Sequence, residues 1–220
     1  MSHLRLKLLP LVLGLCFLST NACAGLYWET EIVSAPIPNQ PARSTVQRNY
    51  YTKNASRVEI GADTVIITDY VRLVMFQLNT ANKTYIEVNL ASGPSTGGGE
   101  MERAEAPTVK PANEVRTIAG YKCRKEKVTF MKAQSEYWVT KDIKGYAEFS
   151  DIGANLADLS KKAPNLRQMS FVGMIDVLDG FPVREVTPLL GGNITSTLRK
   201  IEQKKLAPEL FQVPQNYKLR

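Results

Sequence analysis

The chain has 220 residues, 44% of them hydrophobic, and a formal net charge of +7, so it is long enough to bury one substantial core. Its single histidine, His3, and two of its three cysteines, Cys16 and Cys23, lie near the amino terminus. If the first 24 residues are removed, Cys123 has no partner cysteine, and histidine-based triads, zinc sites and redox cysteine pairs are all excluded. We therefore expect a protein that is not an enzyme and that has no metal or cofactor.

The first 24 residues have the pattern of a secretory signal peptide. Basic residues precede the apolar run 8–18, and Ala22-Cys23-Ala24 supplies the small residues of a cleavage site. The run is too short to span a membrane. We expect export and cleavage after Ala24. The alternative is a lipid anchor at Cys23, but Thr20 stands where a lipoprotein signal requires an aliphatic residue.

From residue 26 onward the chain reads as short strands separated by tight turns. Residues 26–33 and 83–88 alternate apolar and polar side chains, which is typical of strands with one buried face. Gly61-Ala62-Asp63 has the composition of a hairpin turn. Further strands are predicted at residues 45–52, 57–60, 64–69 and 72–78. This spacing favours an antiparallel meander.

Residues 91–114 interrupt the strand pattern with glycines and prolines and contain few large apolar side chains. A phosphate-binding loop is excluded because no Gly-Lys-Ser/Thr follows the glycine run 97–99 and because Glu100 and Glu102 would repel phosphate. We expect a flexible insertion within a single domain of residues 25–220, since strands resume after it.

Three further strands are predicted at residues 115–118, 121–130 and 134–141, and in the last of them Tyr137 and Val139 are expected on the face opposite to Trp138. Basic side chains gather at 122–127 and again at 199–205. A solvated sheet face explains such charge, and contact with an anionic membrane surface is the alternative. Export argues against nucleic acid as a partner.

Residues 150–178 carry apolar side chains at helical spacing. Ser150 is predicted to cap a first helix, Pro164 to end it, and residues 165–178 to form a second helix. The apolar stripe of the first helix contains Phe149, Ile152, Leu156 and Leu159. The pattern fits helices that simply cover one face of a sheet, and it also fits helices that enclose a cavity.

The end of the chain carries the most specific pattern. Two strands, 181–187 and 193–201, form a predicted hairpin. A helical turn at 207–211 follows, and we expect it to pack Phe211 against the sheet. The order of Lys200-Ile201, Leu210-Phe211, Pro214 and Tyr217 resembles the LolA/LolB-like superfamily of periplasmic lipoprotein carriers, and above all uncharacterised envelope proteins of that fold. Ala-Gly-Tyr-Lys-Cys at 119–123 is a second local resemblance.

This resemblance implies an α+β, mainly β fold in which a curved antiparallel sheet, or half-barrel, is covered on its concave face by helices. It also implies a periplasmic, non-enzymatic carrier or chaperone for an apolar ligand, either a lipid-like molecule or an acylated envelope protein. No residue matches a known ligand-contact motif, so the candidate lining residues come from the chain's own apolar pattern: Trp28, Ile86, Phe171 and Met174. The alternative is a structural or protein-interaction component of the envelope without a ligand cavity.

Overall fold

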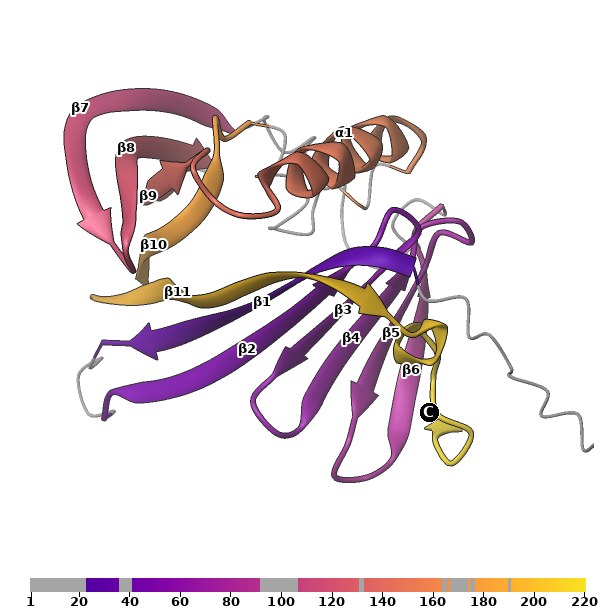
Figure 1. Cartoon of the computed structure of the whole chain (residues 1–220). Helices are drawn as coiled ribbons and strands as arrows, with labels where there is room; N and C mark the ends of the chain where they lie inside the picture. The colour runs from indigo at the N-terminus through magenta and orange to yellow at the C-terminus, as the bar shows by residue number, and fades with distance from the viewer. Residues whose placement is uncertain are drawn as a thin grey trace, which may run out of the picture.

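The computed structural model describes residues 23–35, 41–91, 107–130, 133–163, 166, 174, 177–189 and 191–220. Twelve strands in these ranges form one sheet with the order β12-β6-β5-β4-β3-β2-β1-β11-β10-β9-β8-β7. The sheet is strongly curved, and β7–β9 stand on the same side of the β1–β6 half as helix α1 (Figure 1). The predicted mainly β, half-barrel fold with a helix is confirmed.

The first half of the sheet is an antiparallel meander in which each strand pairs with the next one along the chain. Gly61, in the turn after the third strand, has a φ of 61°, which glycine adopts without steric cost. Every strand predicted before residue 90 is present, 64–69 with the predicted ends and the others with ends shifted by up to three residues. The strands are β1 (Cys23–Ser34), β2 (Arg43–Tyr51), β3 (Ala55–Ile60), β4 (Thr64–Asp69), β5 (Val74–Asn79) and β6 (Thr84–Asn89).

The second half contains β7 (Thr108–Ile118), β8 (Tyr121–Phe130), β9 (Ala133–Thr140), β10 (Phe181–Leu189) and β11 (Gly192–Leu206). β11 also pairs with β1 and so joins the two halves. The short strand β12 (Lys218–Leu219), which the sequence pattern did not reveal, pairs with β6 in parallel.

The start of β7 corrects one sequence-based expectation. Residues 108–114 were assigned to the insertion because the whole stretch 91–114 is rich in glycine and proline, yet they belong to the strand. Pro111 lies where the register between β7 and β8 shifts, and such an irregularity accommodates a residue without an N–H donor. Residues 92–106 lie outside the described residues, as does the segment 1–22.

Helix α1 (Tyr146–Lys162) begins earlier than expected. The predicted cap, Ser150, lies inside the helix, and the capping position is Gly145, whose φ of 89° lets the chain turn into the first helical residue. The earlier start is explained by packing, because the Tyr146 ring stacks against Phe149 on the buried stripe. Of the predicted second helix, only Leu166, Met174 and residues 177–178 are described. None of the described helices is long and apolar enough to cross a membrane.

Both faces of the sheet carry buried apolar side chains. The larger core lies between the concave face and α1, and it includes Leu26, Trp28, Phe149, Leu156 and Phe181. A smaller core on the opposite face of β4 and β5 is covered by the end of the chain, where η1 (Pro208–Phe211) packs Phe211 against the strands as the sequence predicted. Cys123 is completely buried, and burial raises the pKa of its thiol.

Candidate functional site

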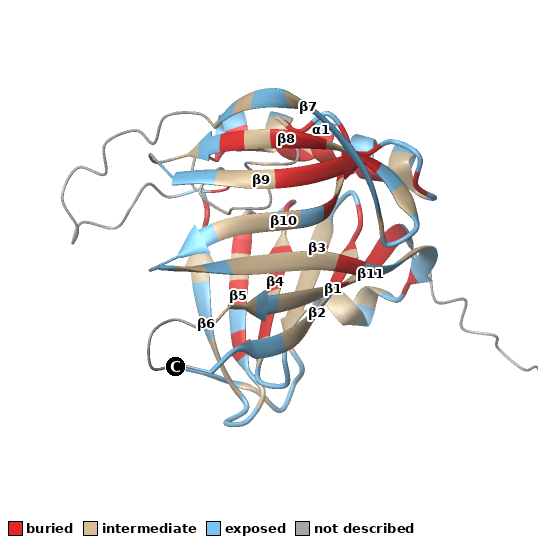
Figure 2. Cartoon of the chain, turned by 90° about the vertical axis from the view of Figure 1, so that its left-hand side faces the viewer, coloured by how far each residue is buried: buried red, intermediate tan, exposed pale blue. Residues whose placement is uncertain are grey.

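A cavity of about 220 Å³ lies between the concave face of the sheet and α1. Strands β1, β2, β9, β10 and β11 contribute to its wall, so both halves of the curved sheet border it. Figure 1 shows why they can meet, because the sheet bends around β10 and β11 and brings β9 over the same side as α1. The second half of β9, nearest to α1, is buried (Figure 2).

One part of the wall is apolar. It is formed chiefly by Trp28, Ile32, Phe149, Met174, Leu178 and Ile194. Behind it, aromatic rings hold each other in place. The Trp28 ring stacks on Tyr51 at a centroid distance of 4.8 Å, and Phe181 meets Trp28 edge-on at 5.7 Å and Phe149 at 4.9 Å. Such contacts add about 0.5–1.5 kcal/mol each beyond area burial, so this wall is preformed.

The other part of the wall is polar and is centred on a carboxylate. Glu185 Oε1 accepts hydrogen bonds from the Tyr137 hydroxyl and from the Thr187 hydroxyl, each at 2.9 Å. Tyr137 is buried, and its pKa is raised by desolvation and by the neighbouring Glu185 charge, so its hydroxyl stays protonated and donates. Among the described lining residues Glu185 is the only charged one, and it forms no ion pair with any described residue.

A second polar group lies on β2. Asn49, which is 1% exposed, donates from Nδ2 to the backbone oxygen of Trp28 at 3.4 Å, and its Oδ1 accepts from Gln47 Nε2 at 2.8 Å. Because the backbone oxygen can only accept, it fixes the orientation of the Asn49 amide and through it that of Gln47. No group of three His, Cys, Asp or Glu side chains within the described ranges could hold a metal ion.

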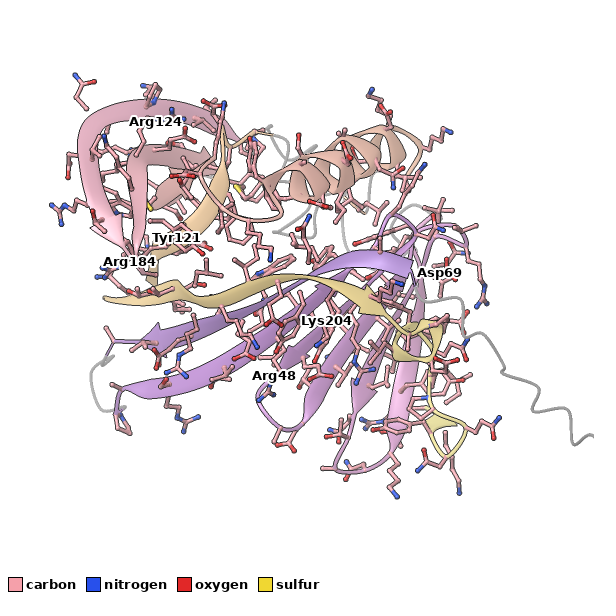
Figure 3. All side chains as sticks on the ribbon, viewed as in Figure 1. Arg48, Asp69, Tyr121, Arg124, Arg184 and Lys204 are labelled. Carbon is pink, nitrogen blue, oxygen red and sulfur yellow. The ribbon has the colours of Figure 1, made fainter. Side chains whose placement is uncertain are left out.

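The edge of the cavity next to Leu178 is fixed by ion pairs. Asp179 binds Arg124 at 2.8 Å and also Lys141, and these contacts lower the pKa of the Asp179 carboxyl. The backbone N–H of Asp179 donates to Glu126 Oε2, while Arg124 binds Glu126 Oε1 at 2.7 Å. Arg124 lies on the upper, β7–β9 part of the molecule in Figure 3. Leu178 is therefore held to β8 by its neighbour in sequence.

The residues that the sequence predicted to line a cavity lie in different parts of the molecule. Trp28 and Met174 both line the cavity. Ile86 lies on the same face of the sheet, because the register connects it to Trp28 through directly opposed residues of β2 to β5. It is nevertheless five strands away, roughly 24 Å along the sheet, and 41% exposed. Phe171 lies outside the described residues.

Sequence reasoning missed the polar part of the cavity. Tyr137 was assigned to a strand face but not to a site, and Glu185 was not singled out. Glu185 is the one acidic residue in the strand that runs from Phe181 to Leu189, and a charge in a mostly apolar strand was the signal that could have found it.

Comparison with protein families gives a match over residues 43–217, most of the chain. The chain belongs to the family described as Domain of unknown function (DUF4412). The search of curated proteins found no match for this DUF4412 chain. The solved structure of PNGF-II is 14% identical with a TM-score of 0.44; the alignment covers 90% of the DUF4412 chain but only 31% of PNGF-II.

Two further solved structures are similar over most of their own length. A LolA superfamily protein from Nitrosomonas europaea is 9% identical, has a TM-score of 0.37, and is aligned over 87% of this chain and 91% of that one. A DUF1329 family protein from Desulfovibrio piger is 13% identical, with a TM-score of 0.38 and coverage of 88% and 91%. A LolA superfamily structure is thus among the solved structures similar to the DUF4412 chain.

Proposed function

We propose that this DUF4412 protein is a non-enzymatic carrier or chaperone that holds an apolar chain between its sheet and α1. The observation that carries the proposal is the cavity of about 220 Å³, walled on its apolar side by Trp28, Phe149 and Met174. Protein interiors are close-packed, and a hollow of this volume in the concave face, partly open to solvent, offers room for a slender ligand.

The size and lining of the cavity favour a slender ligand. Ligand pockets typically measure about 300–1,000 Å³, so a single acyl chain suits this one better than a bulky molecule. Each Å² of apolar surface that the chain buries contributes about 25 cal/mol. Trp28 and Met174 are the proposed contacts, and Met174 adapts readily because its unbranched side chain fits irregular apolar partners.

The proposed setting is the periplasm, where a lipid-like molecule or an acylated envelope protein would supply the chain and the protein could touch a membrane surface. This rests on the signal pattern of the first 24 residues. Cleavage after Ala24 would leave Gly25 as the first residue of β1, still opposite Lys204 of β11.

Calorimetric titration of the full exported protein with a neutral medium-chain alcohol tests the proposal. We expect saturable binding that Met174→Glu weakens by roughly tenfold or more, because an ionised carboxylate in an apolar wall must be desolvated. The matched control is Val71→Glu, since Val71 is 73% exposed and does not line the cavity. Circular dichroism of both variants establishes that each is folded.

Two results would contradict the carrier function. One is the absence of binding to the unaltered protein after bound lipids have been extracted. The other is an equal loss of affinity in Met174→Glu and Val71→Glu. Either result would favour a structural or protein-interaction component of the envelope.

A further inference from the structure

The cavity is amphipathic, and its charge is of one sign. Glu185 is its only charged described lining residue, and the other polar contributors are the neutral side chains of Thr30, Gln47, Asn49, Tyr137 and Ser196. The chain as a whole is basic, with a net charge of +7. The carboxylate in the cavity wall, which has no cationic partner among the described residues, is therefore opposite in sign to the net charge of the protein.

The hydrogen bonds inside the cavity leave some acceptor atoms of its lining residues without a donor among the described residues. Tyr137 and Thr187 both donate to Glu185 Oε1, and no described residue donates to Glu185 Oε2. Thr187 also shares a hydrogen bond of 2.9 Å with Ser135, and neither of these two residues lines the cavity. The carboxylate is thus held in position by one oxygen, while the other remains available.

Gln47 adds a second available acceptor. Its Nε2 is used by Asn49, whose own amide is oriented by the Trp28 backbone oxygen, so Gln47 Oε1 has no donor among the described residues. The hydroxyls of Thr30 and Ser196 can donate or accept. A ligand that brings donors would satisfy Glu185 and Gln47, whereas a ligand that brings only acceptors would leave both unpaired and would be repelled by the Glu185 charge.

We infer that the cavity selects amphiphiles whose polar end is a hydrogen-bond donor, preferably a cationic amine, and that Glu185 and Gln47 are the residues that recognise this end. The inference rests on the proposed carrier function and names its ligand class. The apolar wall at Trp28 and Met174 takes the chain, and the Glu185 carboxylate, oriented by Tyr137, takes the ammonium or hydroxyl group. An anionic fatty acid of the same length is a poor ligand.

The test compares an alkylamine, an alcohol and a fatty acid of one medium chain length, each titrated into the delipidated full protein below its micelle concentration. We expect the amine to bind about tenfold or more tightly than the fatty acid, as a charge-assisted hydrogen bond predicts. Non-specific attraction to this basic protein would produce the opposite order, so a preference for the amine must arise at the site.

Glu185→Gln keeps the shape of the side chain and an acceptor for Tyr137 but removes the charge. It should weaken amine binding about tenfold and leave the alcohol nearly unchanged. The control is Glu202→Gln, because Glu202 carries the same charge, pairs with Lys200 at 3.1 Å and does not line the cavity. Tyr137→Phe, which removes the donor that orients Glu185, should reduce the preference for the amine without abolishing binding of the alcohol.

The possible failures are distinguishable. If the fatty acid binds the unaltered protein as tightly as the amine, or if Glu185→Gln behaves like Glu202→Gln, the head-group inference is wrong and the carrier function stands. If none of the three amphiphiles binds, the carrier function fails, and the inference about its ligand fails with it. The comparison of head groups on the unaltered protein decides the question even if a variant does not fold.

Discussion

Replacing Phe181 by alanine should remove the support behind the apolar wall of the cavity. Phe181 is 1% exposed, and its ring contacts Phe149 at 4.9 Å and Trp28 at 5.7 Å. Phe→Ala at a buried site costs about 3–5 kcal/mol, and the two edge-on aromatic contacts account for about 1–3 kcal/mol of it. Since single domains are stable by about 5–15 kcal/mol, the variant should lose about a fifth or more of its stability.

Urea unfolding followed by far-ultraviolet circular dichroism measures the loss. The matched control is Phe76→Ala, since Phe76 is 8% exposed in the core on the other face of the sheet, where it meets Tyr85 at 6.0 Å. Both variants should be destabilised, but only Phe181→Ala should also weaken binding of the alcohol, because Phe181 contacts Trp28 whereas Phe76 lies in the core on the other face of the sheet. A loss below about 1 kcal/mol for Phe181→Ala would refute the tightly packed wall.

Two further predictions concern the stability of the sheet. A Cβ on Gly25 would lie 2.6 Å from the Tyr51 backbone oxygen and 2.6 Å from Leu206 Cδ1, so Gly25→Ala should lower the free energy of unfolding by about 1–3 kcal/mol, and an unchanged melting temperature would contradict this packing. Burial raises the pKa of Tyr51 and of Tyr137, so as the pH rises the unfolded chain loses these protons before the folded chain does. The free energy of unfolding should therefore be unaffected below about pH 10 and should fall above it. Urea midpoints measured at several pH values should show this fall, and the fall should be shallower in Tyr137→Phe.

The strands were predictable from the sequence because alternation in a half-buried strand depends only on neighbouring residues. Residues 64–69 and 121–130 were assigned with the ends that the structure has, and Phe211 was expected to pack against the sheet as it does. Two ends that depend on how strands and side chains pack were missed. β7 starts at Thr108 because it pairs with β8 in spite of Pro111, and α1 starts before Ser150 because Tyr146 packs on Phe149.

The sequence by itself determined the mainly β class, the antiparallel meander and the apolar character of Trp28 and Met174. Only the tertiary structure decided that these two residues border the same cavity as Glu185 and Tyr137, while Ile86 lies five strands away on the same face. The reason is physical: periodicity fixes which side of a strand a side chain occupies, but the curvature of the sheet fixes which strands face each other. The pairing of β11 with β1 joins the two halves of that curved sheet, and it brings together residues that are far apart along the chain.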